Sequence, residues 1–209
     1  MTDHDFPREY VALDLETTGF YPDSCRITEI GAVRVSDGAI VSRFQQLVNP
    51  LKPIPAQVTR LTGISDAMVA DQPPLDEALP AFLAWLAAPA GALPVVGHNV
   101  GFDIRFLDHA SRRVAGVPFA CVDYDTMQIS RALFPTQKRH RLVDLIQRFG
   151  IADTEEHRAL SDAIQTHQCL EWMRGWVLDR SGLFADGFRF VPTPATDGTE
   201  ALHQRLVCD

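Results

Sequence analysis

Two carboxylates separated by one residue close the first apolar stretch of the chain. Asp14 and Glu16 follow residues 10–13, which predict a strand. Residues two apart in a strand point to the same face, so both acids project together while Leu13 and Leu15 turn the other way into packing. Such a pair repels unless a cation binds, and hard ions such as Mg²⁺ or Mn²⁺ take all-oxygen ligands. Many acid pairs are merely solvated strand ends, so a metal site requires further acids elsewhere in the chain.

Two such acids head predicted helices. From Asp103, helical spacing gives an apolar stripe of Phe106, Leu107, Ala110 and Val114. From Asp162, the same spacing gives Thr166, Cys169, Met173 and Trp176. An ionised acid at the head of an inward stripe is costly unless it is paired, hydrogen-bonded or metal-bound. First-turn acids are also common for electrostatic reasons alone, but the stripe favours a metal-site role for Asp103.

His157 lies five residues before Asp162. Five helical residues rotate by about 500°, a net of about 140°, so the two side chains could not share one face of a continuous helix. If both act at one site, His157 must lie in the loop before the helix. A lone loop histidine is usually a surface residue, and the neighbouring acids are what make this one a catalytic candidate.

Composition is that of an ordinary globular protein. The chain has 209 residues, 46% hydrophobic and 22% charged, which fits one domain with a substantial core. No apolar run approaches membrane-spanning length, and residues 1–7 lack the apolar core of a signal peptide. The four cysteines are scattered without a CxxC pair, which argues against a zinc site or a disulfide framework. We therefore expect a reducing, cytoplasmic location and no membrane partner.

The net charge of −8 is unusual for a protein that binds nucleic acid, because phosphate binding usually leaves a basic signature. A four-carboxylate site would account for about half of that charge, and two divalent ions would offset it. Basic residues also cluster at 112–113 and 138–141. Solvated surface is the preferred interpretation of the first cluster. For the second, solvated surface and a role in binding carry equal weight.

Periodicity and turn signals predict a mixed sheet with helices. The predicted strands are residues 10–15, 27–36, 40–48, 94–97 and the segment from 121, with a hairpin turn at Asp37–Gly38. The predicted helices are 56–61, 75–87, one beginning after Asn99 as its N-cap, one capped by Asp125 and reaching 133, 142–149, and one from after His157 to about 179. The predicted organisation is a leader at 1–8, a domain at 9–179 and a C-terminal extension of unknown role at 180–209, in which 188–191 could add an edge strand.

Three motifs in order carry a family resemblance. They are Asp14-x-Glu16-Thr17, His98-Asn-x-x-Phe102-Asp103 and His157-Arg-Ala-Leu-x-Asp162. They resemble the exonuclease motifs of the DEDDh (DnaQ-like) 3′→5′ exonucleases. This family includes the proofreading ε subunit of bacterial DNA polymerase III, the exonuclease domain of polymerase C, RNase T and oligoribonuclease. The resemblance covers about residues 9–177. It implies an α/β, RNase H-like fold with a five-stranded mixed β-sheet flanked by α-helices.

Two details refine the resemblance. Leu61-Thr-Gly-Ile64 matches a stretch common in the polymerase-associated members. A variant of the family uses tyrosine four residues before the last acid, where this chain has Arg158. The chain therefore resembles the histidine class.

The resemblance also implies roles for the motif residues. Two divalent metal ions, Mg²⁺ or Mn²⁺, would be cofactors, and Asp14 would bridge them. Glu16 and Asp162 would help hold the ion that binds the attacking water, and Asp103 would complete the second metal site. His157 would be the general base, a role that suits its ordinary pKa near 6.5.

Candidate substrate-binding residues follow from the same motifs. They are Thr17, Thr18, Phe20, Asn99 and Phe102. The backbone at Thr17–Thr18 would contact the terminal nucleotide, and the aromatic rings could stack on bases. Core packing is the competing role, preferred for Phe102 and equally weighted for Phe20. Asn99 would bond in the site or only cap its helix, and His98 is expected to be structural.

Three functions remain open from the sequence. The first is a 3′→5′ exonuclease on single-stranded DNA, in proofreading or repair, which releases nucleoside 5′-monophosphates and has a DNA polymerase as a candidate partner. The second is an RNA 3′→5′ exoribonuclease of the RNase T or oligoribonuclease kind. The third is a catalytically silent accessory module, ranked low because all four acids and the histidine are present. The sequence does not separate a monomer from a homodimer.

Overall fold

Five strands form one mixed sheet in the order β3-β2-β1-β4-β5. The computed structural model describes residues 6–87, 92–180, 189–191 and 205–207. The strands of the sheet are β1 (Glu9–Thr17), β2 (Ile27–Ser36), β3 (Ala39–Leu47), β4 (Val95–Gly97) and β5 (Asp123–Asp125). β1, β2 and β3 are antiparallel neighbours, whereas β4 runs parallel to β1 and β5 runs parallel to β4. The predicted five-stranded mixed sheet is confirmed.

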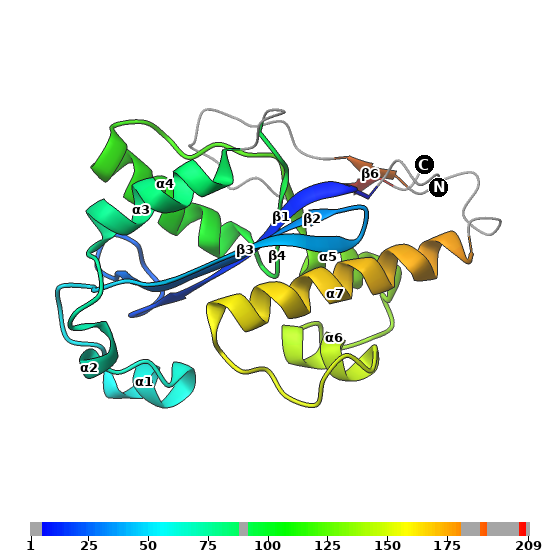
Figure 1. Cartoon of the computed structure of the whole chain (residues 1–209). Helices are drawn as coiled ribbons and strands as arrows, with labels where there is room; N and C mark the ends of the chain where they lie inside the picture. The colour runs from blue at the N-terminus through cyan, green and yellow to red at the C-terminus, as the bar shows by residue number, and fades with distance from the viewer. Residues whose placement is uncertain (1–5, 88–91, 181–188, 192–204, 208–209) are drawn as a thin grey trace.

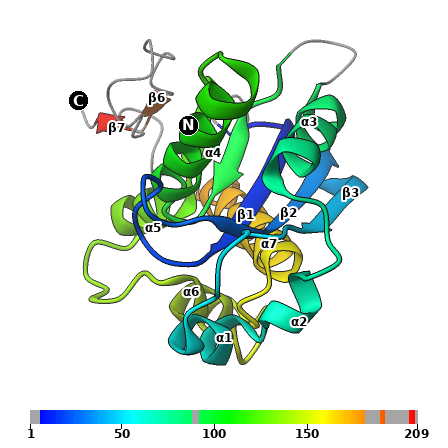
Figure 2. The same cartoon turned by 90° about the vertical axis from the view of Figure 1, so that its left-hand side faces the viewer.

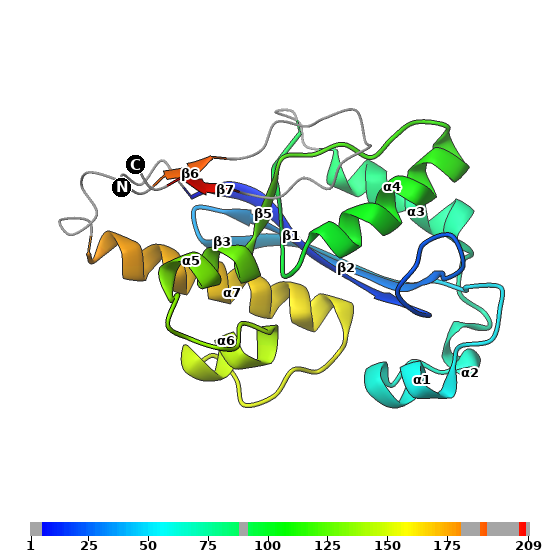
Figure 3. The same ribbon diagram turned by 180° about the vertical axis from the view of Figure 1, so that it is seen from behind.

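Helices cover both faces of this sheet (Figures 1 and 2). They are α1 (Ala56–Thr62), α2 (Asp66–Val69), α3 (Leu75–Leu86), α4 (Gly101–Ala115), α5 (Thr126–Leu133), α6 (Leu142–Arg148) and α7 (Ala159–Leu178). α3 and α4 lie on one face, and the long helix α7 crosses the other, with α5 and α6 beside it (Figure 3). None of the helices in the described part of the chain has the length and apolar character needed to cross a bilayer.

Each face of the sheet has its own core, and β1 contributes to both. Leu13 and Leu15 pack with α3 and α4, whereas Tyr10 and Ala12 pack with α5, α6 and α7. The predicted alternation is therefore confirmed, and it directs the two acids of β1 toward the α7 side. Phe6, which the sequence analysis placed in the leader, is 4% exposed and belongs to the α7-side core.

A glycine lets α7 approach the sheet closely. A Cβ atom added to Gly31 in β2 would lie 2.1 Å from the carbonyl carbon of Ala159 and 2.1 Å from the nitrogen of Leu160. Only glycine leaves room for the helix backbone at this point. The start of α7 is therefore held directly against the strand that pairs with β1.

Two predictions about local structure need correction. The side chain of Asn99 does not cap α4, since the capping position falls on Val100 and no side chain bonds there. Instead Asn99 has a left-handed φ of 60°, and its N–H donates to the Asp125 carboxylate at 2.9 Å. Asp125 also accepts from the N–H of Met127, which confirms its predicted role as the cap of α5.

The second correction concerns the C-terminal extension. Residues 189–191 (β6, Arg189–Val191) pair antiparallel with β7 (Arg205–Val207) in a separate two-stranded sheet. The pairing partner lies later in the chain, so these residues do not extend the five-stranded sheet as an edge strand. Residue 188, where the predicted strand began, lies outside the described residues.

Candidate active site

Three acids from distant parts of the chain meet at one end of the sheet. Asp14 and Glu16 come from β1, and Asp162 comes from the first turn of α7. A carboxylate oxygen of each lies within 4.8 Å of the others, which is close enough for one ion to contact all three. Asp162 is 3% exposed, and the two strand acids are half-buried. The structure thus brings together three of the four predicted ligands directly.

The fourth acid borders this group. Asp103 lies in the first turn of α4, is 2% exposed, and accepts the N–H of Leu15 at 3.1 Å. Its charge raises the pKa of both Asp14 and Glu16. Because α4 and α7 lie on opposite faces of the sheet, the acids of β1 are flanked by one helical acid from each side.

Burial and mutual repulsion shift the pKa values of these acids upward. Burial raises the pKa of Asp14 well above its usual range, and the charges of Asp103 and Glu16 raise it further. Burial, followed by the charge of Asp162, raises the pKa of Glu16 to about 9. The pKa of Asp162 is raised to about 7, again mainly by burial. Such a cluster can be fully ionised near neutral pH only if cations compensate its charge.

The residues present fit divalent metal ions. The Oδ1 atom of Asp162 is buried and has no hydrogen-bond partner among the described residues. A buried carboxylate oxygen without a donor is costly, and a metal ion would satisfy it. Since the neighbouring donors are carboxylate oxygens, the ligand set suits Mg²⁺ or Mn²⁺.

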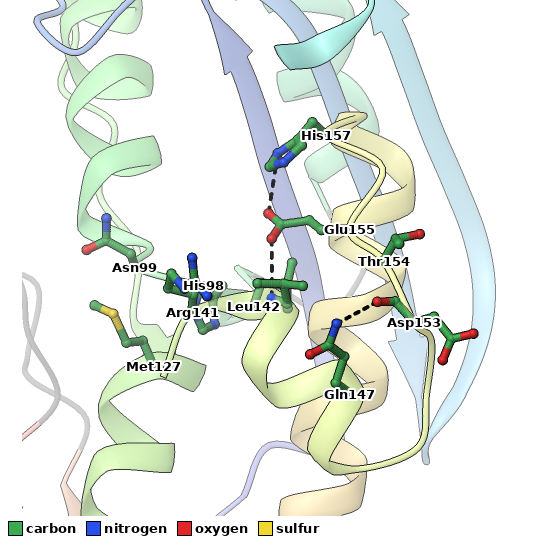
Figure 4. Close-up of a pocket in the computed structure, with 11 residues that line it drawn as sticks. His98, Asn99, Met127, Arg141, Leu142, Gln147, Asp153, Thr154, Glu155 and His157 are labelled. Atoms are coloured by element: carbon green, nitrogen blue, oxygen red, sulfur yellow. Dashed lines mark hydrogen bonds and ion pairs between the residues drawn. The ribbon is translucent and has the colours of Figure 1, made fainter. Parts of the chain in front are cut away.

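His157 lies in the loop just before α7, as predicted. Its backbone has a left-handed φ of 52°, which turns the chain into the helix. The ring nitrogen Nδ1 is 3.6 Å from the carboxylate of Glu155, whose other oxygen accepts the N–H of Val143 at 3.2 Å (Figure 4). Glu155, His157 and Asp162 also offer ligand atoms within 4.8 Å of one another. The histidine and the acid cluster are therefore parts of one site.

An ion pair between the buried Glu29 and the partly exposed Arg158 anchors this loop, and no motif in the sequence predicts it. Arg158 donates two hydrogen bonds to Glu29 of β2, at 3.0 and 2.8 Å, and the N–H of Ala159 donates to the same carboxylate at 3.1 Å. Burial opposes the ionisation of Glu29, but the bonds from Arg158 and Gln45 and the Ala159 N–H lower its pKa below the ordinary value. The only signal in the sequence was an acid between the apolar residues Ile27 and Ile30 of a predicted strand.

Glu155 was also missed. Its charge helps to raise the pKa of Asp14, Glu16 and Asp162, so it belongs to the electrostatics of the site. In the sequence it is one of six consecutive polar residues, Asp153 to Arg158, and such residues usually face solvent. Only its position two residues before His157 pointed to it.

Two of the five predicted substrate-binding residues hold the turn after β1. The Thr17 hydroxyl donates to the carbonyl of Gly19 at 2.7 Å, and the Thr18 hydroxyl accepts the N–H of Arg26 at 2.9 Å. Phe20 follows directly and is 78% exposed. The packing alternative for Phe20 therefore does not apply in this structure, and its ring is free to contact a ligand.

The other candidates differ in exposure. Phe102 packs against Phe106, with ring centroids 5.0 Å apart, in agreement with the packing role preferred for it. Asn99 is exposed. The Nδ1 atom of His98 is 2.9 Å from the hydroxyl of Thr126, and burial lowers the pKa of His98 to about 4, as suits a structural histidine.

An open pocket of about 610 Å³ extends from His157 and Glu155 across to His98 and Asn99 (Figure 4). α6 and the loop before it form much of its wall, through Arg141, Leu142 and other residues. Of the catalytic candidates, His157 therefore lies at the edge of a space large enough to admit part of a polymer.

Comparison with known proteins identifies the family. The RNase_T family model, described as "Exonuclease", matches residues 11–170. The chain belongs to this exonuclease family. The match spans all three motifs and confirms the resemblance to the DnaQ-like 3′→5′ exonucleases.

Curated relatives of this exonuclease include replicative polymerase components. The chain is 36% identical over 166 residues to DNA polymerase III subunit epsilon of Aquifex aeolicus, covering 79% of this chain and 80% of that protein. It is 33% identical over 177 residues to the PolC-type DNA polymerase III of Bacillus cereus, covering 85% of this chain. There the exonuclease spans only 12% of the relative's length.

Solved structures agree with the fold. A complex of exonuclease X with 5′-overhanging duplex DNA is 28% identical, with a TM-score of 0.63, and the alignment covers 83% of this exonuclease and 93% of that chain. A zinc-bound complex of E. coli ExoI with single-stranded DNA is 17% identical, with a TM-score of 0.74, over 86% of this chain and 43% of that one. The latter likeness concerns the fold alone. The predicted RNase H-like fold is confirmed.

Proposed function

We propose that this exonuclease hydrolyses the terminal phosphodiester bond at the 3′ end of single-stranded DNA and releases nucleoside 5′-monophosphates, in proofreading or repair. The observation that carries the proposal is the convergence of Asp14, Glu16 and Asp162, within 4.8 Å of one another, beside His157. Asp103 borders them from α4. Acids and a histidine in this arrangement suit metal-assisted hydrolysis of phosphate esters.

The four acids would hold two divalent ions, Mg²⁺ or Mn²⁺. When bound, such ions make water a stronger nucleophile near neutral pH and stabilise charge on the leaving oxygen. The unsatisfied Oδ1 of Asp162 and the raised pKa values of Asp14 and Glu16 support this assignment. Burial of Asp103 and Asp162, which are 2% and 3% exposed, also limits the water that reaches their oxygens.

His157 would act as the general base. Its Nδ1 faces the carboxylate of Glu155, so the proton of the neutral ring is favoured on Nδ1 and the Nε2 atom is left to accept one. In the reaction, Nε2 takes a proton from water, the water oxygen bonds to phosphorus, and the bond from phosphorus to the 3′ oxygen breaks. That oxygen takes up a proton and becomes the 3′-hydroxyl of the shortened strand. Because the ring is 37% exposed, it can return its proton to solvent.

The terminal nucleotide would be held by the turn after β1. The hydroxyl bonds of Thr17 and Thr18 keep this turn in place, which leaves its backbone fixed beside the acids. Phe20, exposed at the same turn, offers a face on which a base can stack. Stacking of this kind tolerates any base, as an exonuclease that degrades arbitrary sequence requires. Asn99 would bond to substrate from the pocket wall.

DNA is the substrate that the relatives favour. The relatives described above are components of DNA polymerase III, and exonuclease X was solved with duplex DNA. We extend this setting to the present chain and propose a DNA polymerase partner and a cytoplasmic location. The Leu61-Thr-Gly-Ile64 segment, shared with polymerase-associated members, supports the same choice.

A time course on two matched single strands, one DNA and one RNA, tests the proposal. Both are labelled at the 5′ end and incubated with Mg²⁺ or Mn²⁺, and an EDTA sample serves as the control. The expected result is a metal-dependent ladder that shortens the DNA from its 3′ end. A ladder on RNA alone would transfer the same residues to an exoribonuclease. Absence of hydrolysis on both strands would contradict the proposed activity.

A further inference from the structure

The pocket that begins at His157 ends at a basic segment with no role in the proposed chemistry. Arg141 lines this pocket together with His98 and His157 (Figure 4). Lys138 and Arg139 precede it in the sequence. We name residues 138–141 the basic loop. From the sequence alone, a solvated surface and a binding role for this loop carried equal weight.

The basic loop is held in a defined conformation. His140 is 9% exposed, and its Nδ1 and Nε2 atoms contact the Ser130 hydroxyl at 2.8 Å and the Gln137 carbonyl at 3.0 Å. Arg148 of α6 donates to the carbonyl of Arg139 at 2.9 Å. With His140 turned inward, the three cationic side chains of the loop lie exposed. An ordered cationic surface loses little entropy when it binds an anion.

Arg141 keeps binding capacity despite its ion pair. It donates from Nε and Nη2 to the two carboxylate oxygens of Asp144, at 2.8 and 2.9 Å. A guanidinium has five N–H donors, so three take no part in this ion pair and can reach an anion. The Arg141 side chain is 65% exposed, whereas that of Asp144 is 13% exposed, so the free donors of the guanidinium face solvent. Asp144 therefore orients the guanidinium and leaves three of its five N–H donors for an anion.

We propose that the basic loop binds the phosphate backbone of the nucleic-acid strand upstream of its 3′-terminal nucleotide, with Arg141 as the contact nearest the catalytic site. The inference rests on the proposed function, because it assumes that a 3′ end enters beside His157. A chain of net charge −8 with four clustered acids repels a polyanion. Arg141 on the pocket wall, with the exposed Lys138 and Arg139 before it in the chain, offsets that repulsion where the strand must pass.

Arg112 provides a matched comparison. It is 46% exposed and forms the same kind of ion pair, with Asp108 at 2.9 Å, but it lies near the end of α4 and does not line this pocket. Both arginines are thus paired with an acid nearby in the sequence, Arg112 through Nε alone and Arg141 through Nε and Nη2, but only Arg141 lines the pocket. A general effect of lost surface charge would appear in both variants.

The test measures kcat and KM of Arg141→Ala, Arg141→Lys and Arg112→Ala on two substrates across a range of salt concentrations. One is a labelled single DNA strand, and the other is the p-nitrophenyl ester of thymidine 5′-monophosphate, which has no upstream phosphate. Binding of a fluorescent strand with phosphorothioate 3′ linkages, followed by anisotropy, gives a readout that does not require hydrolysis.

The expected result for Arg141→Ala is a rise of about fivefold in KM for the strand and a smaller change for the ester. The slope of log affinity against log salt should become shallower by about 0.7, the loss of one phosphate contact to a single strand. Arg141→Lys should keep most of the slope, and Arg112→Ala should match the parent protein. An unchanged slope in Arg141→Ala, or equal losses on both substrates, would overturn the inference. If the parent protein hydrolysed neither substrate, the proposed function would fail while anisotropy still decided the role of the loop.

Discussion

At the scale of single residues, the site concentrates negative charge where the fold removes water. Asp162 of α7 is buried beside the half-buried acids of β1, and the pKa values of all three acids rise as a consequence. Each acid would be more stable alone in solvent, so the arrangement costs folding free energy that bound cations recover. The proposed metal requirement should therefore be measurable in stability as well as in activity.

Without metal, the protein should lose stability as pH rises. The pKa of Glu16 is about 9 in the folded chain against 4.5 ordinarily, and that of Asp162 is about 7 against 3.8. A carboxyl with a raised folded pKa favours the folded state below its unfolded pKa, and this advantage disappears as pH rises through the folded pKa. Thermal melts in EDTA should therefore show a Tm that falls across this window.

Two comparisons control for other titrating groups. Mn²⁺ should raise Tm more near the upper end of the window than near the lower end, because the ionised acids bind it. Asp162→Asn should flatten the pH dependence of the metal-free protein. A metal-free Tm that stays constant or rises across the window would contradict the assigned pKa shifts.

Replacing His157 with alanine should lower kcat by about 10²–10⁴-fold, the usual loss for a general base, and leave Mn²⁺ binding intact. His109→Ala is a matched control, since both histidine side chains are 37% exposed and each forms one ion-pair contact with an acid, at 3.6 Å from Glu155 for His157 and 3.5 Å from Asp23 for His109. Steady-state kinetics and calorimetric titration with Mn²⁺ measure the two effects. Loss of Mn²⁺ affinity in His157→Ala would instead make the histidine a ligand.

At the scale of elements, the position of α7 decides the geometry of the site. This helix carries Asp162, and the loop before it carries His157. The close approach at Gly31 and the ion pair between Glu29 and Arg158 fix its first turn against β2. β2 in turn pairs with β1, which places Glu29 opposite Glu16 across the two strands.

Gly31→Ala should therefore impair both stability and hydrolysis. The added Cβ would lie 2.1 Å from backbone atoms of Ala159 and Leu160, so α7 must move, and overpacking of this kind costs about 1–3 kcal/mol. Gly175→Ala is the control, because a Cβ there meets nothing within 4 Å, and a helical Gly→Ala change stabilises by about 0.5–1 kcal/mol. Denaturant unfolding and strand hydrolysis measure both variants. Equal behaviour of the two would show that the close approach does not control the site.

At the scale of the whole molecule, the sequence predicted the features that depend on residues close together in the chain. Alternation in β1 and the motif spacing identified the acids and the loop histidine, because period and order are written in the chain itself. Contacts between distant segments were not predictable in this way. Nothing local to Glu29 indicates that Arg158, 129 residues later, neutralises it.

The prediction that Asn99 caps α4 was wrong for the same reason. Its residue type suits an N-cap, but Asp125 from the neighbouring strand holds its N–H and leaves the capping position to Val100. The strand proposed for residues 188–191 likewise depended on a partner, β7, that its own sequence does not specify. Local propensity describes an element, and tertiary partners decide where it lies.

The decisive experiment compares Asp162→Asn with Asp123→Asn for Mn²⁺ binding and strand hydrolysis on the same preparations. The two acids are matched, being 3% and 1% exposed and each with a pKa of about 7, but only Asp162 belongs to the acid cluster. We predict that Asp162→Asn weakens Mn²⁺ binding and abolishes hydrolysis, whereas Asp123→Asn retains both. Near-normal hydrolysis in Asp162→Asn would contradict the assignment of these acids as the metal-dependent catalytic site.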